Sequence, residues 1–63
     1  MKVGEILLFL KGIEKSWGLG ILLEVIDNDY EQVHKIYFPE KGIGLLYTSS
    51  ELVNNTMNIS KRS

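Results

Sequence analysis

The sequence contains no cysteine, only one proline and only one histidine. Without cysteine, the chain has no disulfide, no thiolate metal ligand and no thiol nucleophile. A domain that does not depend on disulfides suits a reducing compartment. We therefore expect a cytoplasmic protein.

Long apolar segments are also missing. The apolar run Ile6–Leu10 is bracketed by Glu5 and Lys11, whereas a membrane-spanning helix needs about 18 apolar residues or more. The same run is shorter than the apolar region of a signal peptide, which has about 7–15 residues. We therefore expect neither a membrane span nor a secretion signal.

A strong excess of one charge is the third absence. Seven basic and eight acidic residues leave a formal net charge of −1. Nucleic-acid-binding domains are usually basic overall or on one face. The overall charge does not favour that class, and only a local basic patch would support it.

The residues that are present suit one small domain. The chain has 63 residues, of which 44% are hydrophobic, and a domain of this size buries only about 60% of the surface that its unfolded chain exposes. We expect a single domain over residues 1–60. Residues 61–63 offer no apolar side chain to bury, so we expect them to form a frayed tail.

Short apolar or alternating segments, separated by turn residues, predict five strands. They are Glu5–Leu10, Ile21–Ile26, Gln32–Phe38, Ile43–Tyr47 and Thr56–Ser60. The turn signals between them are Asp27–Asp29 and Pro39–Gly42, and the glycines at 18 and 20 predict a bend or bulge before the second strand.

A capping box precedes the last strand. Thr48 and Glu51 have the spacing at which a Thr hydroxyl and a Glu carboxylate each accept from the other's backbone amide. Only Leu52–Val53 is apolar after it, which predicts one helical turn over Thr48–Val53. The order of elements predicts an all-β fold, a five-stranded SH3-like (Tudor-like) barrel with one short helical turn, because closure also removes unpaired edges.

Alternation along the strands predicts which side chains form the core. The expected members are Ile6, Leu8, Ile21, Leu23, Val25, Ile36, Phe38, Leu45, Leu52 and Ile59. In the first strand, Leu7 and Phe9 are the alternative to Ile6 and Leu8. Val33 has the opposite parity to Ile36 and Phe38, so either Val33 lies outside the ladder or a bulge resets the register.

The segments Val3–Glu5, Gly18–Ile21 and Ile36–Phe38, with Gly42 and Leu52, form a familiar layout. It resembles the SH3/Tudor-like CarD-type RNA-polymerase-interaction domain and the C-terminal module of UvrD/PcrA-type helicases. Those modules have a Val-Gly-Asp-like start, a Gly-x-Gly-x-Val, a Val-x-Phe and a Leu after the final turn. The resemblance spans roughly residues 3–53 and implies a small barrel and a partner in transcription or nucleic-acid processing.

The chain also departs from that pattern. Ser16–Trp17 stands where family members often carry a His-Pro pair, and the basic character of the helicase tails is absent. The shared positions are glycines at bends and apolar residues facing inward, which any small barrel needs. The resemblance therefore bears more on the fold than on the partner.

No recognisable catalytic or metal-binding constellation is present. His34 has no nucleophile or second acid at a telling spacing. Asp27, Asp29 and Glu31 alternate like the start of a calcium loop, but the required glycine and final glutamate are missing. Gly18–Gly20 lacks the third glycine and the helix of a dinucleotide fingerprint. We expect no enzyme, no metal and no cofactor.

Loop aromatics and nearby lysines are the candidate partner-binding residues: Trp17, Lys11, Lys15, Tyr30 and Tyr37. Trp17 shares its loop with Lys11 and Lys15. Aromatic side chains at barrel loops can hold a cation, a base or a proline. The other reading of Trp17 is that it folds over one end of the barrel and completes the core.

These observations favour a non-enzymatic protein-interaction module, an accessory or regulatory protein of bacterial or phage type, that binds through the first loop and the adjoining sheet face. The alternative is a nucleic-acid-binding barrel that uses Trp17, Lys11 and Lys15. An enzyme ranks third, and a structural subunit that associates with itself through apolar strands ranks fourth. We expect a protein partner and no membrane.

Overall fold

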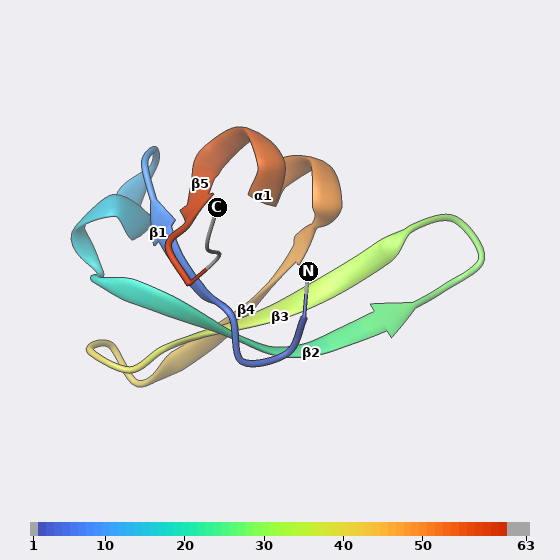
Figure 1. The fold of residues 1–63 in the computed structure, drawn as a ribbon, viewed down its shortest axis with the longest axis horizontal. Helices are drawn as coiled ribbons and strands as arrows, with labels where there is room; N and C mark the ends of the chain where they lie inside the picture. Colours follow the sequence, from blue (N-terminus) through green and yellow to red (C-terminus); the bar gives the residue numbers. More distant parts are fainter. Residues whose placement is uncertain (1, 61–63) are drawn as a thin grey trace.

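Strands are the main secondary structure of the computed structural model, which describes residues 2–60. Its elements are β1 (Ile6–Phe9), the 3-10 helix η1 (Ile13–Ser16), β2 (Leu19–Asp27), β3 (Gln32–Phe38), β4 (Ile43–Thr48), α1 (Ser49–Asn55) and β5 (Thr56–Asn58) (Figure 1). The five strands form one antiparallel sheet in the order β4-β3-β2-β1-β5. β4 and β5 are its edges, so the sheet is not closed.

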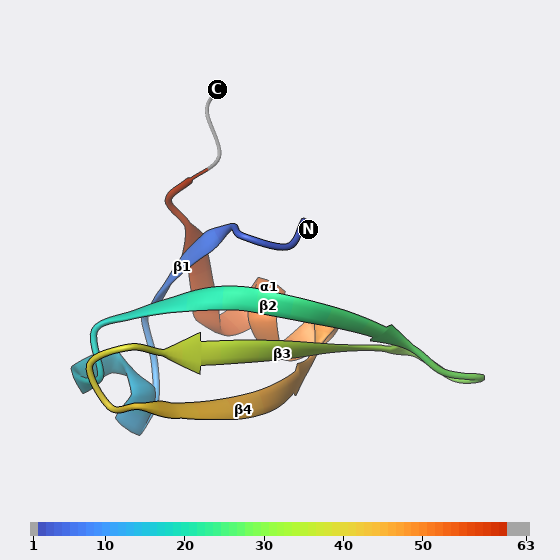
Figure 2. The ribbon, with the colours of Figure 1, turned by 90° about the horizontal axis from the view of Figure 1, so that it is seen from below.

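The five predicted strands are confirmed, with shifted ends. β2 begins at Leu19, earlier than predicted, because only Gly18 has the positive φ, 79°, that a bend requires. Gly20 lies inside the strand, where a Cβ would approach Phe38 and Phe9 to 3.4 Å and Ile36 more closely still. The sheet is strongly bent, and α1, β1 and β5 lie on one side of the long β2–β3–β4 layer (Figures 1 and 2).

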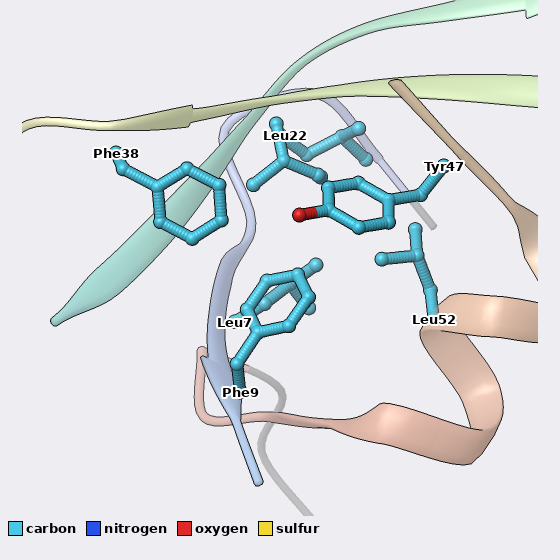
Figure 3. Packing of buried hydrophobic residues seen from close by; sticks show 7 residues of the cluster. Leu7, Phe9, Leu22, Phe38, Tyr47 and Leu52 are labelled. Atoms are coloured by element: carbon cyan, nitrogen blue, oxygen red, sulfur yellow. The ribbon is translucent and has the colours of Figure 1, made fainter. Parts of the chain in front are cut away.

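The core lies on the face of the sheet that α1 covers, which we call the inner face. Its buried hydrophobic residues are Leu7, Phe9, Leu22, Ile36, Phe38, Tyr47 and Leu52 (Figure 3). Three of them, Ile36, Phe38 and Leu52, were predicted, and β1 takes the alternative parity with Leu7 and Phe9.

The other predicted core positions are corrected by the structure. Ile6, Leu8 and Ile21 are half-buried on the opposite, outer face, because Ile6 and Leu8 alternate with the inner residues of β1 and Ile21 pairs with Ile6. The remaining residues of the prediction are Leu23, Leu45 and Ile59, which are exposed, and Val25, which is half-buried against the core. Parity was misassigned in β2, where Leu22 and not Leu23 points inward.

The parity of Val33 predicted an irregularity in the ladder, and the structure places this irregularity in the neighbouring strand, β2. Val33 is inside the ladder and pairs with both Ile26 and Thr48, while the register shift falls in β2 between Leu22 and Glu24. β3 itself alternates without interruption. Its inner face takes the buried His34 in place of Val33.

The capping box is confirmed. The Thr48 hydroxyl accepts from the Glu51 amide at 3.2 Å, and the Thr48 amide donates to Glu51 Oε1 at 2.9 Å. The predicted single turn is a seven-residue helix, which ends where the Thr56 hydroxyl donates to the Leu52 carbonyl at 2.6 Å. Leu52 faces the core and holds α1 against the sheet.

The fifth strand is short. β5 stops at Asn58, earlier than predicted, and the Ile59 amide donates to the Ile6 carbonyl at 3.0 Å. The frayed tail predicted for residues 61–63 lies outside the described residues. Within residues 2–60, no helix has the length and apolar character to cross a membrane.

Candidate partner-binding surface

The connection between β1 and β2 is built around η1. The Lys15 amide donates to the Gly12 carbonyl and the Trp17 amide to the Glu14 carbonyl, at 3.2 and 3.0 Å. Trp17 follows η1 directly, and Gly18 then turns the chain into β2 with its positive φ. The backbone of this connection therefore fixes where Trp17 enters the domain.

The sequence left open whether Trp17 is a core residue or an exposed binding residue, and the structure shows features of both. It is half-buried, and its ring meets Phe38 edge-on with 5.2 Å between the ring centroids. Lys41 Nζ lies 5.7 Å from the centroid of the Trp17 ring, within the range of a cation–π interaction. Trp17 thus packs on the core with one edge and keeps part of its ring accessible.

An aromatic cluster continues from Trp17 into the core. Phe9 lies 5.2 Å, centroid to centroid, from both Phe38 and Tyr47. These tilted and edge-on arrangements are the favourable geometry for aromatic pairs. The cluster holds the first connection against β3 and β4.

Glu14 ties η1 to β4. The Tyr47 hydroxyl donates to Glu14 Oε2 at 2.9 Å. Burial, followed by this hydrogen bond and the negative charges of Glu14 and Glu51, raises the pKa of Tyr47 above its ordinary value. The phenol is therefore held in its neutral, donating form.

The β3–β4 turn also meets the first connection. The amides of Lys41 and Gly42 both donate to the Phe38 carbonyl, at 3.0 and 2.7 Å, which brings Glu40 and Lys41 back toward Trp17. The Glu40 carboxylate lies against the Cα of Gly18, where a Cβ would collide with it. Because this carboxylate is the far end of a flexible, exposed side chain and can move aside, Gly18 is required for its positive φ.

The structure groups the five candidate residues unequally. Lys11 and Lys15 are exposed on the same connection as Trp17. Tyr30 is 96% exposed at the tip of the β2–β3 hairpin, at the opposite end of the molecule (Figure 1). Tyr37 is half-buried on the outer face. Only Lys11, Lys15 and Trp17 form a local group.

Tyr37 belongs to a second, apolar grouping. Cross-strand register aligns Tyr37, Ile21 and Ile6 in one row and Leu19, Leu8 and Met57 in the adjacent row. We call these six residues the outer apolar face. Met57 is 50% exposed and Leu19 38% exposed, and the other four are half-buried. Leu19 joins this face to the first connection, because it follows Trp17 by two positions.

Sequence reasoning missed Leu19, Met57 and Lys41 as surface features. Alternation within residues 56–60 does not indicate that Leu8 and Leu19 lie in one row with Met57. Lys41 lies far from Trp17 along the chain, and no local pattern indicates their contact. The missing signal is strand pairing for Leu19 and Met57, and the meeting of two distant connections for Lys41.

Within residues 2–60, no three His, Asp or Glu side chains are grouped to hold a metal, and no pocket indents the surface. His34 is 3% exposed, in register with Val25 and Tyr47, and its Nδ1 has no hydrogen-bond partner within the described residues. No family model, curated protein or solved structure matches the chain.

Proposed function

We propose that this chain is a non-enzymatic protein-interaction module, built as a variant of the SH3-like barrel, whose partner docks on the outer apolar face. The observation that carries the proposal is the pair of apolar rows that cross β3, β2, β1 and β5. Apolar patches of this kind on a small domain commonly mark sites of protein association. The sheet order and the α1 turn before β5 support the barrel-like assignment.

The first connection supplies the rim of the proposed site. Lys11 and Lys15 are exposed on the connection that leads into Leu19 of the outer apolar face, and Trp17 is half-buried on the same connection. Interfaces combine an apolar centre with a polar rim, and aromatic residues are enriched in them. The partner that fits best is a protein with an apolar patch bordered by acidic residues. An accessory role in transcription or nucleic-acid processing is part of this proposal.

The test compares two exposed apolar positions in a nuclease-treated affinity capture. Met57→Glu places a charge within the outer apolar face, and Ile26→Glu places the same charge on β2 outside it, at a residue that is 39% exposed. We expect Met57→Glu to lose a partner that both the wild type and Ile26→Glu retain. Equal capture by all three proteins would contradict docking on this face.

Nucleic-acid binding is the second candidate, because Lys41 lies over Trp17 in addition to Lys11 and Lys15 on the same connection. Bases stack on aromatic rings, and lysines contact phosphates. This function predicts a log-linear fall of affinity with salt, shallower when Lys11 or Lys15 is replaced. A protein interface centred on apolar residues should respond weakly to salt.

A further inference from the structure

The outer face of β2 and β3 continues past the outer apolar face toward the hairpin tip. Figure 2 shows both strands in front of α1, and no described segment lies over their outer face there. Glu24 and Lys35 are exposed on this part of the sheet, and Ile26 is 39% exposed. This part of the outer face is therefore open to a second molecule.

The residues on the outer face of these two strands form three cross-strand pairs. The pairs are Ile21 with Tyr37, Glu24 with Lys35, and Ile26 with Val33. Within β2 and β3, Glu24 and Lys35 are the only charged residues on this face, because Asp27 alternates onto the opposite face with Val25. An apolar row therefore lies on each side of one charged row, which contains one acid and one base.

We propose that two copies of the chain pack the outer faces of β2 and β3 against each other, about a two-fold axis that runs parallel to the two strands and between them. Sheets pack face to face about 10 Å apart, with strand directions within about 30° of each other. About this axis, each residue faces the residue that is its own cross-strand neighbour, but from the other copy. Ile21 of one copy therefore faces Tyr37 of the other, and Ile26 faces Val33.

The charged row indicates that the occupant is a second copy. Glu24 of each copy faces Lys35 of the other, and each of these side chains also neighbours the opposite charge of its own chain. The four charges alternate in sign when the two faces meet. A purely apolar partner would exclude water from Glu24 and Lys35 without supplying a new opposite charge, which is costly. Complementary charges of this kind specify the partner and its register more than they add affinity.

The dimer also regulates the proposed partner site. Ile21 and Tyr37 belong to the outer apolar face, so the second copy covers part of the surface on which the partner docks. Dimerisation and partner binding therefore compete. This competition rests on the proposed function, whereas the pairing of the two copies does not.

The experiment reverses the two charges separately and together. Glu24→Lys sets four positive charges in the central row, and Lys35→Glu sets four negative charges there. Each single variant should raise the dissociation constant of the dimer by at least about tenfold, because like charges across an interface oppose association. The double variant Glu24→Lys/Lys35→Glu restores the alternation of charge and should dimerise like the wild type. An equimolar mixture of the two single variants should do the same.

Glu31→Lys is the matched control, because it makes the same change of charge at an exposed residue of the hairpin turn. Sedimentation equilibrium over a roughly hundredfold range of concentration measures the dissociation constants of such a weak interface. Circular dichroism and melting temperatures establish that each variant is folded. A wild type that stays monomeric would overturn the proposal, as would single variants that dimerise like Glu31→Lys. A double variant as monomeric as the single ones would overturn the proposed register.

Cross-linking of the wild type tests the same contact without any substitution. Unlabelled and isotope-labelled chains are mixed in equal amounts and treated with a carbodiimide, which joins a carboxylate to an amine in direct contact. We expect cross-links between Glu24 and Lys35 that combine one labelled and one unlabelled peptide. Cross-links at these residues within single chains only would overturn the proposal.

The nuclease-treated capture separates this inference from the proposed function. At a concentration at which the wild type is dimeric, Glu24→Lys should capture more of the partner, because its outer apolar face is uncovered. Equal capture by Glu24→Lys and the wild type would overturn the competition. If no variant captures a partner, the proposed function fails, while sedimentation and cross-linking still decide whether the two copies pair.

Discussion

The two ends of the β2–β3 hairpin carry aromatic residues in very different surroundings. At the end formed by the first connection and the β3–β4 turn, Trp17 packs edge-on against Phe38, beneath Lys41. At the other end, Tyr30 is 96% exposed in a turn that Asn28 organises, by accepting from the amides of Tyr30 and Glu31 at 2.9 and 2.8 Å.

Trp17 and Tyr30 both lie in connections next to β2, so their positions in the sequence do not explain why one is half-buried and the other is exposed. The difference arises from the segments that meet at each end. Three segments converge on Trp17, whereas the turn of residues 28–31 extends beyond the layer that α1 covers (Figure 1). An aromatic residue in a loop is therefore part of the fold or free for a partner according to long-range packing.

We call the end of the hairpin at which Trp17 lies the packed end. The largest expected loss of stability there follows Trp17→Ala. Truncating a fully buried Trp costs about 3–5 kcal/mol. Since Trp17 is half-buried, we expect a loss of about 2–3 kcal/mol in the free energy of unfolding, measured with urea. A change below about 0.5 kcal/mol would show that Trp17 is a free anchor, and the contrast between the two ends would fail.

Thr48→Ala tests whether α1 stabilises the packed end. Loss of an N-cap threonine costs about 0.5–2 kcal/mol, and here it also removes one half of the capping box. We expect a lower urea midpoint with an unchanged slope. Ser50→Ala, an exposed position in the same helix, is the control and should have a much smaller effect. An unchanged midpoint for Thr48→Ala would indicate that the capping box does not form.

Tyr47→Phe removes the hydrogen bond to Glu14 and keeps the ring. We expect a loss of about 0.5–1.5 kcal/mol in the free energy of unfolding at neutral pH, typical of one hydrogen bond and larger if the acceptor is charged. Glu14→Gln tests the same bond from the acceptor side, and it should also lower stability.

The Tyr47 hydroxyl also makes the stability of the domain depend on pH in the alkaline range. Because the pKa of Tyr47 is raised in the folded state, the unfolded chain loses this proton first, above about pH 10. The stabilising contribution is complete below that pH and is lost as pH rises further. Urea midpoints measured from pH 8 to about pH 11 should fall more for the wild type than for Tyr47→Phe. Parallel curves would contradict a buried, bonded phenol.

Tyr30→Ala should have the smallest effect. The side chain is almost fully exposed, and the turn is organised by the Asn28 side chain and by backbone groups. Exposed substitutions of this kind usually change stability by less than about 0.5 kcal/mol. A loss comparable to that of Trp17→Ala would show that the hairpin tip is docked, and it would remove the distinction between the two ends.

The sequence by itself determined the local features of this protein. The capping box at Thr48, the Asx turn at Asn28 and the bend at Gly18 each depend on a few neighbouring residues, whose side-chain and backbone chemistry acts over short separations. Strand positions followed from alternation for the same reason. Lys11, Lys15 and Trp17 could be grouped because one connection contains all three.

Only the tertiary structure decided which face of each strand is buried and how Trp17 is used. Leu7 and Leu22 became core residues because cross-strand register, together with a bulge in β2, sets the parity of neighbouring strands. The outer apolar face depends on the same register, and the contact between Lys41 and Trp17 depends on the meeting of two distant connections. These features depend on contacts between residues far apart in the chain, and a one-residue change in the register of a strand would exchange the two faces of that strand.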